Sequence, residues 1–379
     1  MAAVNLPHDD IDPDGLLEYS VVFTDLSLNH MSQRFVGVMQ ETIDILRSTY
    51  QARSVAVVPG GGTYAMEAVA RQLATGRRTL VLRNGLFSYR WSQIFDVGSI
   101  PAASTVLTAR PVGEGHQAPW QPAPVEEVVA AIRAERPEVV FAPHVETASG
   151  MVLPEEYLRA VAEATHDGGG LFVLDCVASG ALWVDMADLG VDVLITAPQK
   201  GWSGSPGAGL VMFGEAGHAA VVQSQTTSFA ADLKKWLSIA EEYRAGHAPY
   251  HATMPTDTLA HNVELMRATT ERGLEALRSA QTELGARVRD LLASRGLPSV
   301  AAEGFAAPTV VVVHTDDSDL YSGAAFKRVG LQVAAGVPLQ CGEGEDFSTF
   351  RIGLFGLDKL GDVDGTVARL EAALDALGV

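Results

Sequence analysis

Residues 171–213 constrain the fold of this chain more than any other stretch. They contain three short apolar runs, LFVLD, DVLIT and GAGLVMF, and each run ends where polar residues or glycines begin. Continuous apolar runs of this length are typical of parallel strands that are buried on both faces of a sheet. In such sheets ligands bind beyond the carboxyl ends of the strands. We therefore expect the polar residues that follow these runs to form a binding site.

Two charged residues follow the first two runs. Asp175 ends LFVLD, and Lys200 lies in a loop of glycine, proline and serine after DVLIT. Burial favours the neutral form of a lysine amine, which is a nucleophile that carbonyl compounds capture. Enzymes that use pyridoxal phosphate pair such a lysine with an acid that faces the pyridine nitrogen. Each residue alone fits an ordinary turn or loop, but together they favour this catalytic pair.

The remaining sequence up to residue 213 alternates between strand and helix patterns. Ser32 is placed to cap a helix from Gln33 to about Tyr50, and SVAVVPGGGTYAMEAVARQL has the pattern of a strand, a glycine turn and a helix. Such alternation predicts an α/β fold with a mostly parallel, doubly wound sheet. The proline-rich patch QAPWQPAP is expected to be a loop.

After residue 213 the pattern changes. One helix is expected over 228–243, and one long helix or two joined helices over 257–294. The strands PTVVVVH and DFSTFRIGL and a C-terminal helix then predict a smaller α+β domain. The expected division is an N-terminal arm over residues 1–30, a large domain over 31–270 and a small domain over 271–379.

Further site candidates follow other strands of the predicted sheet. Gly61, Gly62 and Thr63 expose backbone N–H groups and a hydroxyl at a helix N-terminus, where anions bind. This turn matches neither the dinucleotide-binding nor the P-loop pattern, and a purely structural turn fits it equally well. Phe87 fits either a core aromatic or a ring that stacks on a cofactor. Another strand ends at polar residues that include Thr147.

Composition excludes several classes of partner and site. The net charge of −19 disfavours binding to nucleic acid or to an anionic membrane surface. The two cysteines, Cys176 and Cys341, provide no disulfide framework and no zinc-site spacing, and we expect no metal. No stretch has the length of a membrane span, and the N-terminus has no apolar signal segment. We expect a cytoplasmic protein.

With these residues assembled, the chain resembles the class V aminotransferases of the fold-type I pyridoxal phosphate enzymes, and within them the alanine–glyoxylate and serine–glyoxylate aminotransferases. The likeness is carried by the motifs PGGGTYAMEAV, HVETASG, DVLITAPQKGWSGSPG, PYHATMP and FRIGLFG, which occur in the family's order. It implies fold-type I architecture, pyridoxal 5′-phosphate as cofactor, and a homodimer with shared active sites. The N-terminal stretch lacks the Gly-Pro opening of many relatives, which leaves the substrate open.

The resemblance also implies a role for each matching residue. Lys200 matches the lysine that forms the Schiff base, Asp175 the partner of the pyridine nitrogen, and Arg351 the arginine that binds the substrate carboxylate. The remaining matches concern the cofactor. They are the phosphate residues Gly62, Thr63 and Gln199 with the adjoining Gly61, the stacking position Phe87 where relatives usually carry Trp, Thr147 near the ring oxygen, and Tyr250 and Thr253, which reach the phosphate of the neighbouring subunit.

The implied activity is a ping-pong transfer of an amino group from a small amino acid, of the alanine or serine type, to a 2-oxo acid such as glyoxylate or pyruvate. Three alternatives stay open. The first is a cysteine desulfurase or lyase that uses Cys341, although Gln199 stands where those enzymes usually carry His. The second is a 2-aminoethylphosphonate–pyruvate transaminase, because PGGGTYAMEA also resembles those enzymes. The third is a non-catalytic binding module, which the lysine, acid and glycine turn disfavour.

Overall fold

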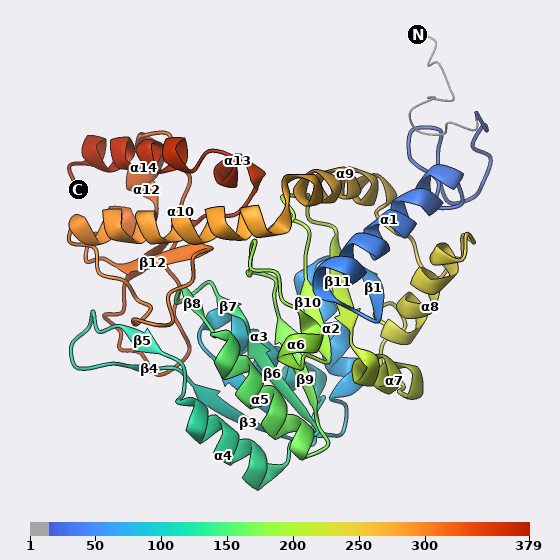
Figure 1. Ribbon diagram of the computed structural model, residues 1–379, viewed down its shortest axis with the longest axis horizontal. Helices are drawn as coiled ribbons and strands as arrows, with labels where there is room; N and C mark the ends of the chain where they lie inside the picture. Colours follow the sequence, from blue (N-terminus) through green and yellow to red (C-terminus); the bar gives the residue numbers. More distant parts are fainter. Residues whose placement is uncertain (1–14) are drawn as a thin grey trace.

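The computed structural model describes residues 15–379 and shows a mixed α/β protein (Figure 1). Residues 15–32 contain no helix or strand, and the rest of the predicted arm lies outside the described residues. The first helix, α1 (Gln33–Tyr50), begins at Ser32, whose Oγ accepts a hydrogen bond from Phe35 N. The predicted helix and its cap are therefore confirmed.

A seven-stranded sheet forms the centre of the molecule, with the strand order β1-β11-β10-β9-β6-β2-β3. Its strands are β1 (Ser54–Pro59), β2 (Arg78–Arg83), β3 (Ala103–Thr108), β6 (Val139–Pro143), β9 (Leu171–Asp175), β10 (Val193–Thr196) and β11 (Ala208–Phe213). Neighbouring strands from β10 to β3 are parallel. The mostly parallel, doubly wound sheet is thus confirmed, in agreement with solved structures compared below.

The prediction that all three runs of residues 171–213 are parallel strands is wrong for β11. This strand pairs antiparallel with β10 on one side and with β1 on the other. The connection from β10 to β11 contains no helix. A parallel neighbour needs a long crossover, usually a helix, whereas an antiparallel neighbour does not. Because the strand is buried along its whole length, its apolar run looks like that of a parallel strand.

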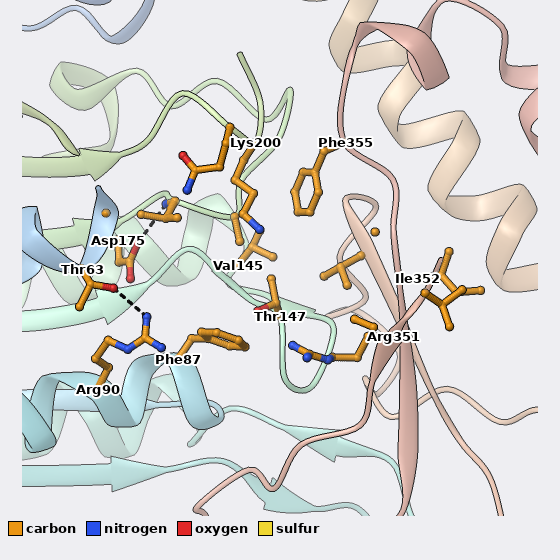
Figure 2. A pocket seen from close by; sticks show the side chains of 18 of the residues that line it. Thr63, Phe87, Arg90, Val145, Thr147, Asp175, Lys200, Arg351, Ile352 and Phe355 are labelled. Atoms are coloured by element: carbon orange, nitrogen blue, oxygen red, sulfur yellow. Dashed lines mark hydrogen bonds between the residues drawn. The ribbon is translucent and has the colours of Figure 1, made fainter. Parts of the chain in front are cut away.

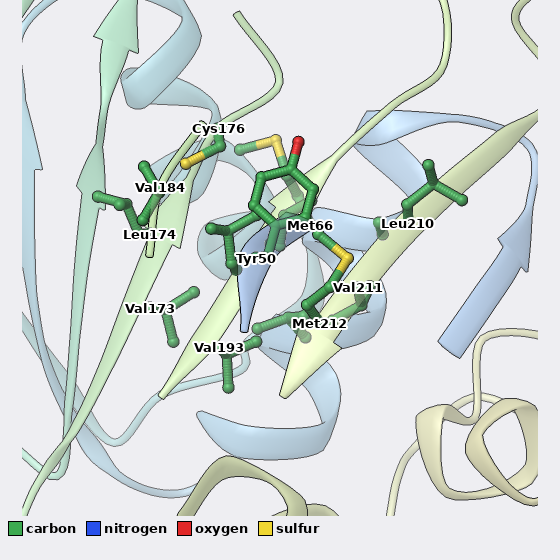
Figure 3. Close-up of a cluster of buried hydrophobic side chains, with 14 of the residues drawn as sticks. Tyr50, Met66, Val173, Leu174, Cys176, Val184, Val193, Leu210, Val211 and Met212 are labelled. Atoms are coloured by element: carbon green, nitrogen blue, oxygen red, sulfur yellow. The ribbon is translucent and has the colours of Figure 1, made fainter. Parts of the chain in front are cut away.

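Helices cover the sheet. The helices of the large sheet are α2 (Gly62–Leu73), α3 (Leu86–Gly98), α4 (Val125–Glu135), α5 (Glu155–Asp167) and the short α6 (Met186–Leu189). Helix α2 packs against β11 and α3, and α5 packs against β9 and α4. Figure 3 shows buried side chains from several elements in contact, among them Tyr50, Met66, Val173 and Met212. Each such large apolar side chain contributes about 1.5–3 kcal/mol when fully buried.

Two local predictions differ from the structure. The helix expected over 228–243 is α8 (Leu233–Arg244), because Asp232 caps it by accepting hydrogen bonds from the N–H groups of residues 234 and 235. A separate helix, α7 (Glu215–Gln223), precedes it. The proline-rich patch contains the short strand β5 (Trp120–Gln121), which pairs with β4 (Arg110–Pro111). The two residues of β5 are not prolines and therefore keep the backbone N–H groups that strand pairing uses.

The C-terminal part forms a second, smaller sheet. Strands β12 (Val310–His314), β14 (Thr349–Gly353) and β13 (Ala334–Ala335) pair antiparallel in that order. The segment 257–294 is two helices, α9 (Thr256–Arg272) and α10 (Leu274–Ser294), separated by Gly273 at a φ of 86°. Residues 318–377 add α11 (Ser318–Tyr321), α12 (Ala324–Arg328), α13 (Leu357–Leu360) and α14 (Val363–Leu377). The exact domain boundary at 270/271 stays a prediction.

In Figure 1 the small sheet, α10 and α14 lie side by side, apart from the large sheet and its helices. A two-stranded pair, β7 (Val145–Glu146) with β8 (Met151–Val152), lies between the two sheets, and an isolated bridge joins Met151 to Ala306. Among the helices of residues 15–379, none is both long enough and apolar enough to cross a membrane.

Candidate functional site

A cavity of about 710 Å³ opens where the carboxyl ends of the large sheet face the small sheet (Figure 2). Most of the predicted site residues line it: Gly62, Thr63, Phe87, Thr147, Asp175, Gln199, Lys200 and Arg351. The cavity thus brings together residues as distant in the sequence as Gly62 and Arg351, which are nearly 300 positions apart. Gly61, Tyr250 and Thr253 do not line it.

Asp175 is the last residue of β9, between β6 and β10 in the sheet. Its side chain is only 8% exposed, and its Oδ1 accepts a hydrogen bond from Val177 N at 3.0 Å. Burial raises the pKa of Asp175 to about 6, against the opposing effect of the Val177 N–H, and the nearby Glu146 raises it further. A buried carboxylate with this single hydrogen bond is well suited to receive a cationic or N–H partner.

Lys200 lies in the loop that joins β10 to β11. Its side chain is partly buried, and burial lowers its pKa, with the charge of Arg351 as a smaller cause. The loop is closed by hydrogen bonds from Ser203 N to Lys200 O at 3.1 Å and from Gly204 N to Pro198 O at 2.9 Å. A Cβ on Gly201 would collide with the carbonyl oxygen of Gly180. The backbone of the loop is therefore held against the chain that follows β9.

The N-terminus of α2 forms one end of the cavity. Gly62 and Thr63 begin this helix, so their N–H groups are free of intrahelical partners and favour an anion. Thr63 Oγ1 accepts a hydrogen bond from Arg90 Nη1 at 3.0 Å (Figure 2). The amide of Gln199 also lines this cavity, and its buried Oε1 has no hydrogen-bond partner within residues 15–379. This end of the cavity combines helix N–H groups, a hydroxyl, an amide and a guanidinium.

Phe87 lies between two arginines of the cavity. The Cζ of Arg90 is 5.3 Å from the centroid of its ring, and that of Arg351 is 5.5 Å from it. Arg351 belongs to β14, its Nε donates a hydrogen bond to Ala335 O at 2.9 Å, and its guanidinium points into the cavity. Burial lowers the pKa of Arg351, and the charge of Glu146 opposes this effect. The cavity therefore has one cation, Arg351, at its small-sheet wall and another, Arg90, beside the N-terminus of α2.

Glu146 directly precedes Thr147 and has a structural role. Its buried carboxylate accepts hydrogen bonds from Ser88 N at 2.8 Å, Ala148 N at 2.9 Å and Phe87 N at 3.3 Å. Burial raises its pKa although these hydrogen bonds oppose the shift. The contacts fix the first turn of α3, and hence the position of the Phe87 ring.

Tyr250 and Thr253 lie away from the cavity. Their hydroxyls are 3.3 Å apart, the tyrosine side chain is 57% exposed, and its ring is 5.4 Å from that of His30. Gly61 precedes α2 and supplies its N-cap backbone; its carbonyl oxygen lies against Gly209 of β11, and the residue does not line the cavity. Within one subunit these residues do not join the other site candidates.

Cys341 is not part of the cavity either. Its Sγ lies 3.4 Å from the carbonyl oxygen of Arg83 and 3.6 Å from that of Leu339. Burial raises the pKa of this thiol to about 12, with Glu343 as a further cause. A reactive cysteine needs a lowered pKa and access to its substrate, whereas this thiol has a raised pKa and lies outside the cavity.

Four polar or aromatic residues that line the cavity are not among the predicted site residues: Arg90, Gln332, Phe355 and Lys359. Arg90 stands three positions after Phe87 in α3, and residues at this spacing lie on the same face of a helix. This spacing is the sequence signal that links Arg90 to the site. Phe355 and Lys359 follow the FRIG motif, but no local pattern indicates that this part of the small domain faces Lys200. Lys359 Nζ is paired with Asp358 Oδ2 at 2.9 Å.

Comparisons with known proteins identify a family and solved structures of the same fold. The family model described as "Aminotransferase class-V" matches residues 17–336. The chain is 27% identical to the soluble hydrogenase small subunit of Synechococcus sp. (strain PCC 6716), over 93% of this chain and 88% of that protein. It is 28% identical to the 2-aminoethylphosphonate–pyruvate transaminase of Burkholderia ambifaria (strain MC40-6), over 96% of both chains. The crystal structure of an alanine–glyoxylate aminotransferase from Nostoc sp. superposes with a TM-score of 0.75 at 24% identity, covering 91% of this chain and 88% of that one.

Proposed function

This chain belongs to the class-V aminotransferase family, and on that premise we propose that it transfers the amino group of a small amino acid, of the alanine or serine type, to a 2-oxo acid such as glyoxylate or pyruvate. Enzymes of this family depend on pyridoxal phosphate. The observation that carries the proposal is that one cavity is lined by Lys200, Asp175 and Arg351, which are an amine, a buried acid and a carboxylate-binding cation.

The residues of the cavity fit pyridoxal phosphate. The N-terminus of α2, Thr63, Arg90 and the side-chain NH2 group of Gln199 are suited to its phosphate, because together they offer N–H and O–H donors and a positive charge. Asp175, with its single hydrogen bond to a backbone N–H, is suited to the protonated ring nitrogen. Phe87 is suited to stack on the ring, and Thr147 to lie near the ring oxygen. When bound, the cofactor supplies an aldehyde for amines and a ring that withdraws electrons from the substrate.

The residues of this chain then have separate tasks. Arg351 binds the carboxylate of the amino donor through its planar guanidinium and so orients the donor in the cavity. The amine of Lys200, whose pKa is lowered by burial, accepts the proton from the donor Cα. Asp175 keeps its charge next to the ring nitrogen and so stabilises a positive charge there.

The three alternatives have unequal support. The 28% identity to a 2-aminoethylphosphonate–pyruvate transaminase keeps an aminophosphonate donor as a second candidate, because Arg351 would also bind a phosphonate. A desulfurase or lyase reaction of Cys341 is disfavoured, since that thiol lies outside the cavity with a raised pKa. The retained amine, acid and anion-binding end also disfavour a non-catalytic binding module.

The active enzyme is proposed to be a homodimer with shared active sites. Apolar side chains are exposed along the N-terminal segment, among them Leu16, Tyr19 and Val21. Tyr250 and Thr253 point away from the cavity of their own subunit, which suits the expected contact with the phosphate of the neighbouring subunit. Exposed apolar side chains grouped in one segment are typical of an interface between subunits. Light scattering of the purified protein measures the mass directly.

The cytoplasm remains the proposed location. Both cysteines are free thiols, Cys176 buried and Cys341 partly buried, which suits a reducing compartment. Fractionation of cells that express the tagged full chain checks this location.

The proposed reaction is tested by profiling donors and acceptors. The protein loaded with pyridoxal phosphate is supplied with alanine, serine, aspartate or 2-aminoethylphosphonate, and with glyoxylate or pyruvate, and the new amino acid is quantified. The proposal expects the largest kcat/KM for alanine or serine. A preference for 2-aminoethylphosphonate would support the second candidate, and no transfer with any pair would contradict both.

A further inference from the structure

Phe355 forms the wall of the cavity next to Lys200. The centroid of its ring is 5.2 Å from Lys200 Nζ, and Figure 2 shows the two side chains next to each other in the cavity. The partly buried ring packs against a buried apolar cluster that includes Val145 and Val310, which also line the cavity. The wall next to the amine is therefore apolar and continuous.

The loop that carries Phe355 is held on both sides of the ring. Leu354 N donates a hydrogen bond to Thr309 O at 2.9 Å, and Leu354 O accepts one from Gln281 Nε2 at 3.1 Å. On the other side, Leu357 N donates to Ser203 Oγ at 2.8 Å, and Ser203 belongs to the loop of Lys200. These contacts join the two loops directly. The hydrogen bonds therefore hold the backbones of the two loops relative to each other and keep the Phe355 ring on the Lys200 side of the cavity.

This distance limits the space at the reacting carbon of the substrate. A carbon that gives its proton to Lys200 must come within about 3 Å of Nζ, and carbon atoms of the substrate cannot approach ring carbons closer than about 3.5 Å. With the ring centroid 5.2 Å from Nζ, the ring narrows the space on this side of the carbon and favours a methyl or hydroxymethyl substituent over a branched chain.

We propose that Phe355 is a specificity-determining residue that restricts the amino donor to small side chains. The inference rests on the proposed function, because it takes Lys200 as the proton acceptor and Arg351 as the carboxylate ligand. The charges of the cavity agree with it: the remaining cation at the small-sheet wall, Lys359, is already paired with Asp358 at 2.9 Å. Apart from Arg351, this wall has no unpaired cation among residues 15–379 to bind a second acidic group of the donor.

Substitution of Phe355 by alanine and by leucine tests the proposal. The kcat/KM values of alanine and leucine as donors are compared in the cofactor-loaded variants. Phe355→Ala should raise the ratio of leucine to alanine by about tenfold or more, since one or two methylenes in a pocket change discrimination by about 10- to 200-fold. Phe355→Leu should have an intermediate effect. Phe347→Ala is the matched control, because Phe347 is partly buried in the same cluster but lines a different cavity.

Binding of unreactive acids provides a readout that does not depend on turnover. Acetate, butyrate and 4-methylpentanoate carry the carboxylate for Arg351 but no amine, and calorimetry measures their Kd for the loaded protein. Phe355→Ala should tighten 4-methylpentanoate relative to acetate by about tenfold, and Phe347→Ala should leave the ratio unchanged. If both ratios in Phe355→Ala and Phe355→Leu stay within twofold of the wild type, the proposal is wrong. If the wild type transfers no amino group at all, the proposed function fails, whereas the acid series still decides the role of Phe355.

Discussion

Arg90 Nη1 donates a hydrogen bond to Thr63 Oγ1 at 3.0 Å, which joins the first turns of α3 and α2. Arg90 also lies near the Phe87 ring, with 5.3 Å between its Cζ and the ring centroid. The guanidinium is thereby fixed beside the free N–H groups of a helix N-terminus. This contact adds a full positive charge to an end of the cavity that the glycine turn alone would make only weakly attractive to anions.

Arg90→Gln should weaken the binding of pyridoxal phosphate by about 10- to 100-fold, because hydrogen bonds to charged groups contribute about 1.5–3 kcal/mol. Pyridoxal without the phosphate should bind both proteins alike. Titration followed by absorbance measures both affinities. The control is Arg110→Gln, which removes an exposed arginine paired with Glu127 far from the cavity. Equal losses for pyridoxal and its phosphate would contradict a role at the phosphate.

Lys200→Ala should abolish amino transfer, with a decrease of at least about 10³-fold, since the proton acceptor at the donor Cα is lost. The fold should persist, because the side chain lies in a cavity and makes no hydrogen bond that holds the loop. Borohydride should covalently fix the cofactor to the wild type and not to the variant, as mass spectrometry shows. Lys234→Ala, on the exposed side of α8, is the control. Transfer at wild-type rate by the Lys200 variant would exclude this residue as the catalytic amine.

The stability of the cofactor-free protein should depend on Asp175 between about pH 4 and pH 6. Burial raises the pKa of Asp175 to about 6 in the folded protein, whereas the unfolded chain has a value of about 3.9. The folded state therefore keeps a proton that the unfolded state releases, so ionisation of Asp175 lowers the free energy of unfolding as the pH rises through this window. The loss amounts to about 3 kcal/mol at neutral pH, at about 1.4 kcal/mol per pKa unit.

Asp175→Asn removes this dependence. Urea denaturation of the variant and the wild type, from about pH 4 to about pH 8, should show a difference that grows in favour of the variant up to about pH 6 and is constant above it. Asp346→Asn, in an exposed loop, should show no such growth. A constant difference across the whole range for Asp175→Asn would mean that its pKa is not raised.

Cys341→Ser should leave amino transfer within about twofold of the wild type, because the thiol lies outside the cavity and its pKa is raised to about 12. The measurement is kcat/KM with alanine and glyoxylate, together with an assay for sulfide release from cysteine. Sulfide release by the wild type that is lost in this variant would instead support the desulfurase alternative.

Mixing two inactive proteins tests the shared active sites. One carries Lys200→Ala, and the other carries Tyr250→Phe with Thr253→Ala. If Tyr250 and Thr253 serve the neighbouring subunit, each mixed dimer contains one site with all three residues intact. Random exchange of subunits should then restore about a quarter of wild-type activity. No activity above that of the parent proteins after exchange would place these residues in the site of their own subunit or outside any site.

Much of the fold could be predicted because its signals are local. The sequence predicts the helix from Gln33 to about Tyr50, since an N-cap serine precedes it and an apolar stripe lies within its own sequence. The direction of β11 could not be predicted in this way. A buried strand has the same apolar run in either direction, and only the short connection from β10, once the sheet is formed, decides which direction is possible.

The same division holds for the site. The sequence alone indicated Asp175 and Lys200, because each follows a strand of recognisable pattern, and the motifs around them carry the family resemblance. Arg90 and Phe355 were not predicted, because their importance depends on how close they lie to Thr63 and Lys200 in the folded protein and not on their sequence neighbours. Tyr250 and Thr253 are expected to reach the cofactor phosphate of the neighbouring subunit, which stays a prediction; they do not line the cavity of their own subunit.

What the sequence by itself determined is therefore the order of the helices and strands, the α/β class and the identity of the residues at the strand ends, because hydrophobic period and capping act over a few residues. Tertiary packing alone decided which wall each side chain faces. The ring at position 355 meets the amine at position 200 only because the loops that carry them are hydrogen-bonded through Ser203 and Leu357. Contacts between residues so distant in the chain depend on how whole elements pack, and no local pattern encodes that geometry.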